Sequence, residues 1–445
     1  MKPDNFSAAE QYLHGFINYE RAMERLSSGA LRLDRVRRLW NAAEVDPGGI
    51  PAVHIAGTKG KGSCATAAAE ILRASGVRVG LYTSPHFFSL RERIRVLDGE
   101  DSARDGVAPE EFLLIVRDLY PLLERFRQSA DPQWRPTFFE VLTLIAWKYF
   151  LRRGVEVMVL ETGMGGRLDA TNVVTPAVSV LTAIDFDHMQ WLGASLRAIA
   201  SEKAGIIKRG IPVVSACQRP AAARVIRRVC DRQQSPLFLS GREFEALTPR
   251  GMRGGVRFDF RFLDRIFPGM KLPLAGLHQA ENAACACAAV AVLREQGRIT
   301  VPVRLKDGLK SVVMPGRFER VKNRPRVVVD VAHNPASFRA LGQTIKRYFP
   351  GVRVILIFGA AKDKRVRAML SGLEYGECIC AGFSHPRAFA PEQLCRAVGG
   401  QYRTARNIKE AFSLAKKLYN KDSLIVVTGS FFLVSEAKAY FGTGT

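Results

Sequence analysis

The chain has no uninterrupted run of about 18 apolar residues, the length that a membrane-spanning helix needs. Its first residues, MKPDNFSAAEQYLHG, lack the basic and then apolar profile of a secretory signal peptide. Eight cysteines among 445 residues are too few for a disulfide scaffold. These absences argue against a membrane-spanning or disulfide-stapled secreted protein and predict a cytoplasmic location.

The cysteines include two close pairs that could suggest a metal site. Cys285 and Cys287 lie in an Ala-rich segment that reads as a helix, where residues two apart point to different faces. Cys378 and Cys380 could share one face of a strand, but no histidine or second pair stands nearby at ligand spacing. Both pairs are therefore interpreted as buried free thiols.

Acidic residues are scarce relative to basic ones. The chain has 42 Asp and Glu against 66 Lys and Arg, which gives a formal net charge of +24. Clustered cations favour nucleic acid through counterion release, but here the charge is spread over separate segments such as RLDRVRRLW, RVIRRVCDR and AKDKRVR. A cationic surface also attracts small polyanions such as nucleotides and polycarboxylates. Small-molecule substrates are therefore expected, and nucleic acid is not.

With 47% hydrophobic residues, the chain has enough apolar material for globular cores. Short apolar runs alternate with longer amphipathic segments, a pattern typical of a mainly parallel sheet covered by helices on both faces. The predicted strands of the first part are 52–57, 77–83, 155–161, 177–184 and 211–216, and the predicted helices are 63–75, 109–127 and 137–152. Ligands of such sheets bind at the carboxyl ends of the strands.

A second alternating series follows an Ala-rich helix at 278–296 and the linker-like segment EQGRITVPV. Its predicted strands are 326–333, 352–360, 378–383 and 423–430. The predicted fold is therefore α/β throughout: a P-loop-type ATPase domain over residues 1–297 and a smaller Rossmann-like α/β domain over 298–445.

The segment AVHIAGTKGKGS, residues 52–63, runs from an apolar strand through a glycine-rich turn into a helix. Three glycines let backbone N–H groups converge on phosphate oxygens, the helix start adds positive potential, and a lysine and a serine add a charge and a hydroxyl. The segment differs from the common G-x-x-x-x-G-K-[ST] pattern because a glycine separates the lysine from the serine. The predicted ATP-binding residues are Gly57, Thr58, Lys59, Gly60, Lys61, Gly62 and Ser63.

Glu161 ends an apolar strand, where a carboxylate is costly unless it is paired or bound to a cation. Metal ligation is the favoured interpretation of this residue.

Further blocks follow in order along the chain: YTSPHFFSLRERI, LETGMGGRLDATN, DFDHMQWLG, EKAGI, PGRFE and DVAHNP. Together with GTKGKGS, they resemble the folylpolyglutamate synthase and dihydrofolate synthase family of the Mur ligase superfamily. The resemblance implies an ATP- and Mg²⁺-dependent ligase that adds glutamate to dihydropteroate, to a folate, or to both. It implies an acyl phosphate intermediate. Nothing in the sequence demands more than one copy of the chain, so a monomer is expected.

The resemblance also implies roles for individual residues of the first domain. Ser84, Glu161 and His188 would hold magnesium, with two ions expected, although histidine is an unusual ligand for this ion. Lys203 would become a carbamate by reaction with carbon dioxide, and Lys61 would also act in catalysis. Without the resemblance, Lys203 reads as an ordinary exposed lysine at the start of a helix.

The pterin-bearing substrate is expected at two segments, one of which begins the helix at 137–152. Phe138 and Phe139 could equally be core residues of that helix. The implied substrate-binding residues are Thr137, Phe138, Phe139, Glu140, Leu168, Asp169 and Ala170.

The remaining implied contacts are Asn282, at the helix before the linker, and four residues of the second domain. Asn282, Arg317 and Asp330 match nucleotide contacts, with Asp330 at the ribose. His333 is expected to act near the phosphate or glutamate. Ser430 matches a loop that would bind the carboxylate of the incoming glutamate.

Three positions depart from the family pattern. Arg32 replaces a small residue, Thr162 replaces an apolar residue, and Lys59 stands where asparagine is usual. An additional cation at the phosphates predicts stronger ATP binding or slower ADP release. Two alternatives remain open: a Mur-type ligase for another carboxylate, and a basic P-loop ATPase stimulated by nucleic acid.

Overall fold

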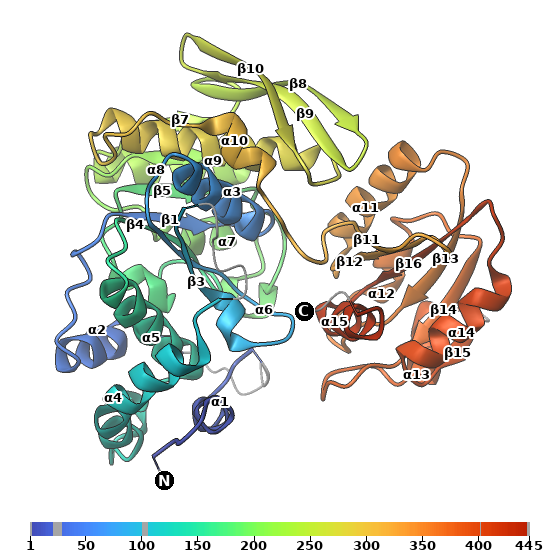
Figure 1. Cartoon of the computed structure of the whole chain (residues 1–445), viewed down its shortest axis with the longest axis horizontal. Coiled ribbons are helices and arrows are strands. Elements are labelled where there is room, and N and C mark those ends of the chain that lie inside the picture. Colours follow the sequence, from blue (N-terminus) through green and yellow to red (C-terminus); the bar gives the residue numbers. More distant parts are fainter. Residues whose placement is uncertain (1, 21–28, 100–105, 401, 443–445) are drawn as a thin grey trace. The chain divides into compact units, whose positions relative to one another are not determined.

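The computed structural model describes residues 2–20, 29–99, 106–400 and 402–442, and the chain divides into two compact units (Figure 1). The first unit comprises Met1–Thr248, Phe258–Leu272 and Ala280–Val312, and the second comprises Pro249–Arg257, Pro273–Gln279 and Val313–Thr445. The division after residue 297 stays a prediction.

The main sheet of the first unit has the strand order β3, β2, β4, β1, β5, β6, β7. Strand β3 runs antiparallel to β2, and the other neighbours are parallel. The strands are β1 Ala52–Ala56, β2 Val79–Tyr82, β3 Ile94–Leu97, β4 Val157–Glu161, β5 Val178–Leu181, β6 Val213–Ser215 and β7 Leu237–Leu239. The predicted mainly parallel α/β fold is confirmed, and β3 and β7 are additions to the predicted strands.

Helices lie on both sides of this sheet, which explains why β1, β2, β4 and β5 are buried along their whole length. The helices are α1 Phe6–His14, α2 Leu33–Ala42, α3 Lys61–Ala74, α4 Pro109–Arg127, α5 Phe138–Arg152, α6 Met189–Leu192, α7 Leu196–Ala204, α8 Pro220–Gln233, α9 His278–Glu295 and α10 Leu305–Lys310. None of the described helices has the length and apolar character needed to cross a membrane.

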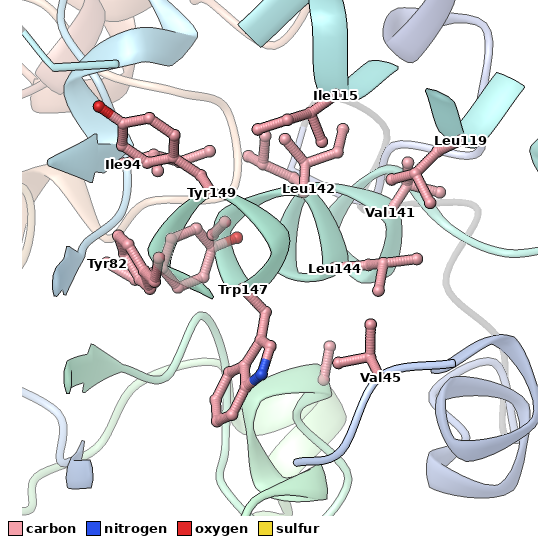
Figure 2. Close-up of a cluster of buried hydrophobic side chains, with 14 of the residues drawn as sticks. Val45, Tyr82, Ile94, Ile115, Leu119, Val141, Leu142, Leu144, Trp147 and Tyr149 are labelled. Atoms are coloured by element: carbon pink, nitrogen blue, oxygen red, sulfur yellow. The ribbon is translucent and has the colours of Figure 1, made fainter. Parts of the chain in front are cut away.

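One hydrophobic cluster packs α5 against α4 and the sheet (Figure 2). Leu142 and Trp147 of α5 are buried with Ile115 of α4 and Tyr82 of β2. Burying one such side chain stabilises the fold by about 1.5–3 kcal/mol relative to leaving it exposed. This core fixes the start of α5, where the predicted substrate residues lie.

A small antiparallel sheet with the order β10, β9, β8 follows the main sheet in sequence. Its strands are β8 Phe244–Met252, β9 Gly255–Phe262 and β10 Arg265–Leu272. None of them was among the predicted strands, although buried and more exposed residues alternate over much of β9. Such alternation is typical of a sheet with one covered face.

The second unit has a sheet with the order β11, β12, β16, β13, β14, β15, in which β11 is antiparallel to β12 and the other neighbours are parallel. The strands are β11 Glu319–Lys322, β12 Val327–Asp330, β13 Arg353–Phe358, β14 Glu377–Ala381, β15 Arg403–Ala405 and β16 Ser423–Thr428. The helices are α11 Pro335–Tyr348, α12 Val366–Leu370, α13 Pro391–Val398, α14 Ile408–Leu418 and α15 Phe431–Tyr440. Four strands match the predicted series, and the predicted C-terminal α/β domain is confirmed.

The paired cysteines are buried free thiols, as predicted. Cys285 and Cys287 lie within α9, and Cys378 and Cys380 lie within β14.

Candidate active site

In the loop between β1 and α3, the backbone at two glycines lies too close to neighbouring side chains to leave room for a Cβ atom. A Cβ atom at Gly57 would lie 1.8 Å from Oγ1 of Thr182, and one at Gly60 would lie 2.1 Å from Oδ1 of Asn282. Gly60 also has a φ of +82°, in the left-handed region that favours glycine. These contacts place the predicted nucleotide residue Asn282 beside the loop.

Helix α3 begins at Lys61, so the N–H groups of Lys61, Gly62 and Ser63 lie in its first turn. The first N–H groups of a helix have no acceptor within it, and this end carries partial positive charge. The structure therefore gives residues 57–63 the strand-to-helix geometry of a phosphate-binding loop.

Glu161 lies at the end of β4, between the phosphate loop and the loop after β2. Its Oε1 is 4.0 Å from Nζ of Lys61, and its Oε2 accepts a hydrogen bond of 3.1 Å from the backbone N–H of Ser84. Because β2, β4 and β1 are parallel neighbours, their carboxyl ends meet at one edge of the sheet. Lys61, Ser84 and Glu161 are therefore brought together.

His188 lies on the loop after β5, the neighbour of β1 on its other side. It precedes α6 with a φ of +48°, and its N–H donates to Asp187 at 3.0 Å. A left-handed backbone is uncommon for a residue other than glycine and marks a tightly specified turn.

The predicted magnesium ligands offer a carboxylate, a hydroxyl and an imidazole. In the described ranges, no three His, Cys, Asp or Glu side chains are grouped as a metal site. The predicted ligands include only two of those types, Glu161 and His188, together with the hydroxyl of Ser84. The carboxylate and hydroxyl are oxygen donors, which Mg²⁺ prefers, and this ion usually keeps water and phosphate oxygens as its other ligands. The oxygen donors therefore fit Mg²⁺.

Lys203 is a buried lysine, not the exposed one that its local sequence suggests. Its side chain reaches from α7 to the phosphate loop, where Nζ donates to the carbonyl oxygen of Gly57 at 2.8 Å. Burial and then the charge of Lys61 lower the pKa of Lys203 to about 7. At neutral pH, a substantial fraction of this side chain is therefore the uncharged, nucleophilic amine.

Lys59 does not extend freely from the loop. Its Nζ lies 2.7 Å from Oδ2 of Asp185. The hydroxyl of the preceding Thr58 donates to the carbonyl oxygen of Asp185 and accepts from its N–H, both at 3.0 Å. The cation added to this loop is therefore already paired with a carboxylate.

Thr137 and Glu140 begin α5 as a capping box, in which each side chain binds the backbone N–H of the other. Arg35 of α2 holds both carboxylate oxygens of Glu140, at 2.6 and 2.8 Å. Burial raises the pKa of Glu140 above its ordinary value, although Arg35 opposes the rise. The structure thus gives Thr137 and Glu140 a structural role, independent of any substrate contact.

Phe138 and Phe139 differ in burial at the start of α5. Phe138 is 1% exposed and belongs to the hydrophobic core. Phe139 is half-buried, and its ring lies so close to Gly163 that a Cβ there would be 2.8 Å from it. Because Gly163 follows Glu161 by two residues, Phe139 lies beside the loop that follows β4.

Asp169 is buried and accepts hydrogen bonds from the N–H of Met164 at 2.9 Å and from the hydroxyl of Thr171 at 2.5 Å. Thr171 in turn lies 2.8 Å from Nε2 of His54 in β1. Burial raises the pKa of Asp169. Leu168 is half-buried and Ala170 is buried. The hydrogen bonds of Asp169 therefore hold this loop in one conformation.

Arg93 was not among the predicted site residues. Its guanidinium is buried, binds both carboxylate oxygens of Glu20 at 2.8 and 2.6 Å, and donates from Nε to Nδ1 of His86 at 2.8 Å. It also lies 5.8 Å from the centre of the Phe138 ring. Arg93 therefore connects the loop of Ser84 and His86 to Glu20 and to the start of α5. The quoted block YTSPHFFSLRERI contains it, but local sequence does not reveal its distant partner.

In the second unit, Asp330 ends β12 and His333 lies in the loop that follows it, at the carboxyl end of the strand. The carboxylate of Asp330 accepts hydrogen bonds from the N–H groups of Phe318 and Ala332, at 2.8 and 2.9 Å. Burial raises the pKa of Asp330, although the charge of Arg317 opposes the rise. Nδ1 of His333 lies 2.9 Å from the carbonyl oxygen of Val331. Because a carbonyl only accepts, Nδ1 carries the proton.

Ser430 precedes α15, and its hydroxyl accepts from the N–H of Phe432 at 3.2 Å. It therefore has a helix-capping role.

The structure places Arg317, Asp330, His333 and Ser430 in the second unit and the other predicted residues in the first.

Two family models match the chain: the Mur ligase middle domain over residues 135–290 and the Mur ligase glutamate ligase domain over residues 316–431. Together with the phosphate loop and the two α/β units, these matches define an ATP-dependent, amide-forming ligase of the Mur type.

Relatives and solved structures indicate which family of Mur-type ligases this chain resembles. The chain is 33% identical to the dihydrofolate synthase/folylpolyglutamate synthase of Bacillus subtilis, over 87% of this chain and 90% of the relative. A crystal structure of Mycobacterium tuberculosis folylpolyglutamate synthase with ADP and AMPPCP matches with a TM-score of 0.88 and 31% identity, over 98% and 99% of the two chains. A folylpolyglutamate synthase complex with AMPPCP and folate matches with a TM-score of 0.82 and 31% identity, over the same shares. The chain belongs to the folylpolyglutamate synthase and dihydrofolate synthase family.

Proposed function

We propose that this chain joins L-glutamate to dihydropteroate, to a folate, or to both, with cleavage of ATP to ADP and phosphate. The observation that carries the proposal is the meeting of Lys61, Ser84 and Glu161 at the start of α3, in a chain with this family membership. A solved relative binds an ATP analogue together with folate, which supports the same pair of substrates here.

The reaction requires two anions to meet. A carboxylate oxygen of the pterin-bearing substrate attacks the γ-phosphorus, which releases ADP and leaves an acyl phosphate. The amine of glutamate then attacks the acyl carbon, loses a proton, and expels phosphate. The N–H groups at the start of α3 and the charge of Lys61 hold and neutralise the transferred phosphoryl group. Two Mg²⁺ ions, held at Ser84, Glu161 and His188, would supply further charge neutralisation.

Lys203 is proposed to be carbamylated. Its neutral amine nitrogen attacks carbon dioxide, forms a C–N bond and loses a proton, which leaves a carboxylate in place of a buried cation. A pKa of about 7 supports this step because only the uncharged amine reacts. The product would relieve the repulsion between Lys203 and Lys61. Incubation with isotopically labelled bicarbonate should give an NMR carbamate signal that is absent from Lys203→Met, and its absence from the parent enzyme would reject the modification.

The other site residues are retained as proposed contacts. Phe139 and the loop of Leu168, Asp169 and Ala170 are proposed to bind the pterin-bearing substrate, with Thr137, Phe138 and Glu140 behind them. Asn282, Arg317 and Asp330 are proposed to bind nucleotide, His333 to act near phosphate or glutamate, and Ser430 to bind the glutamate carboxylate. The monomeric state and the lack of a nucleic-acid partner remain predictions.

The experiment supplies purified protein with ATP, Mg²⁺ and glutamate, with dihydropteroate in one reaction and tetrahydrofolate in another. Mass spectrometry should show products heavier by one or more glutamyl residues, and the pattern separates a monofunctional from a bifunctional enzyme. A Glu161→Gln preparation controls for a contaminating ligase. If neither acceptor gains glutamate in the parent preparation, the proposed function is wrong.

A further inference from the structure

Lys59 puts a cation into the phosphate loop, two residues before the start of α3. Its ammonium group lies 2.7 Å from Oδ2 of Asp185, and the two side chains are only 31% and 17% exposed. We infer that Lys59 is a positioning residue, whose ion pair with Asp185 fixes the phosphate loop against the segment that leads to His188. The inference rests on the proposed ATP and magnesium site, and it does not depend on which acceptor receives glutamate.

The ion pair reinforces an existing connection between these two segments. The N–H groups of Thr58 and Lys59 both donate to the carbonyl oxygen of Ala183, at 3.0 and 3.2 Å. The hydroxyl of Thr58 donates to the carbonyl oxygen of Asp185 and accepts from its N–H. The pair of Lys59 and Asp185 adds a charged side-chain link at the same place.

The carboxylate of Asp185 also orders the turn that follows it. Its Oδ1 accepts from the N–H of Phe186 at 3.0 Å and lies 3.3 Å from Nη2 of Arg219. Burial opposes ionisation of Asp185, but the Lys59 ammonium and the Phe186 N–H hold its pKa below the ordinary value. The turn continues through Asp187, whose carboxylate binds the N–H of His188.

This arrangement makes a direct phosphate contact unfavourable for Lys59. To reach a phosphate, its ammonium would have to leave Asp185, and a partly buried carboxylate without this partner would then lie near the anionic nucleotide. While the pair is intact, it adds no net charge to the site. Its effect is on geometry, because two loops from different strands are held at one spacing.

Hydrogen exchange of the protein without nucleotide or metal tests the inference. Lys59→Asn and Asp185→Asn should each speed amide exchange in residues 183–188 by about fivefold, which corresponds to a partly exposed ion pair of about 1 kcal/mol. The double variant should exchange no faster than either single variant, because both remove the same link. Parent-like exchange in both single variants would overturn the inference.

Two variants control for charge and side-chain size. Lys59→Arg preserves the ion pair and should exchange like the parent. Arg219→Gln removes a cation from the same carboxylate without touching the phosphate loop, and it should also exchange like the parent. Faster exchange in Arg219→Gln that equals that of Lys59→Asn would show that the charge on Asp185 matters rather than the link to the loop, and would contradict the inference.

ADP binding without Mg²⁺ separates positioning from direct contact. On the positioning account, Lys59→Asn made in the Asp185→Asn background changes the ADP dissociation constant by less than about threefold, because the link is already broken. A loss of about tenfold or more in that background would assign Lys59 to the phosphates and overturn the inference. These measurements involve no acceptor, so failure to ligate glutamate would reject the proposed function and leave the inference standing.

Discussion

Nζ of Lys203 donates a hydrogen bond to the carbonyl oxygen of Gly57 at 2.8 Å, across 146 positions of sequence. A buried amine is thereby placed at the first residue of the phosphate loop. Its ordinary pKa is 10.5 and its pKa in the folded protein is about 7. Folding therefore favours the uncharged form, and stability depends on pH.

The first prediction concerns this dependence in buffers free of carbon dioxide. Between pH 7 and pH 10.5 the unfolded chain keeps the Lys203 proton that the native protein has lost, so stability should rise with pH in this window. The contribution is at most about 1.4 kcal/mol per pH unit. Lys203→Met removes it, so urea unfolding should show a shallower rise for the variant between pH 7 and pH 9. Equal slopes for the variant and the parent would contradict the pKa assigned to Lys203.

A second prediction concerns the buried pair of Arg35 and Glu140, whose side chains are 6% and 5% exposed. Arg35→Ala leaves a buried carboxylate without its cation and should lower the free energy of unfolding by about 3–5 kcal/mol. The neighbouring pair of Arg32 and Asp34 is 31% and 51% exposed. Arg32→Ala should cost less than about 1 kcal/mol. Urea unfolding of both variants measures the two losses of unfolding free energy. Equal losses would show that burial does not make the pair of Arg35 and Glu140 more important for stability than the exposed pair.

A third prediction separates backbone strain from steric contact in the phosphate loop. Gly60 and Gly76 have φ angles of +82° and +87°, but only at Gly60 would a Cβ meet another group, Asn282. Gly76→Ala should lose about 1 kcal/mol of stability from the left-handed backbone, and Gly60→Ala should lose more because its Cβ would also overlap Asn282. Only Gly60→Ala should also lose nucleotide affinity, by about tenfold or more, in a calorimetric titration with ADP. Parent-like ADP affinity in Gly60→Ala would contradict the role given to this loop.

A fourth prediction compares two buried threonines. Oγ1 of Thr162 is fully buried with no hydrogen-bond partner, whereas Oγ1 of Thr171 binds Asp169 and lies beside His54. Thr162→Val removes an unsatisfied polar atom and should leave thermal stability unchanged or raise it. Thr171→Val leaves Nε2 of His54 without this partner and removes one of the hydrogen bonds to the buried Asp169, so it should cost about 1–3 kcal/mol. Comparable destabilisation by both variants, measured in parallel unfolding curves, would mean that the hydrogen bonds of Thr171 carry no weight.

Much of this organisation is local in the sequence and could be predicted from it. Near-continuous apolar runs marked β1, β4 and β5 because both faces of a parallel strand are buried. The glycine spacing at 57–62 marked the phosphate loop because backbone conformation restricts which residues fit there. The antiparallel strands β8 to β10 escaped prediction, although the alternation in β9 offered a signal.

The relations that shape the site are distant in sequence and could not be read from it. Arg35 and Glu140 are 105 positions apart, and Lys59 and Asp185 are 126 positions apart. The local sequence around a single arginine or lysine does not indicate which distant carboxylate it pairs with. Arg35 and Lys59 therefore look like ordinary surface cations in the sequence. Lys203 is likewise buried against the phosphate loop, 146 positions away at Gly57, and local propensity does not encode this contact.

The central claim is that the acceptor carboxylate is activated as an acyl phosphate beside Lys61, Ser84 and Glu161. The most direct measurement labels both carboxylate oxygens of dihydropteroate or tetrahydrofolate with a heavy oxygen isotope and follows the label by mass spectrometry during glutamate addition. The account predicts one labelled oxygen in the phosphate released per amide formed, because that oxygen bonds to phosphorus in the first step and leaves with it in the second. Amide formation with unlabelled phosphate would contradict the account.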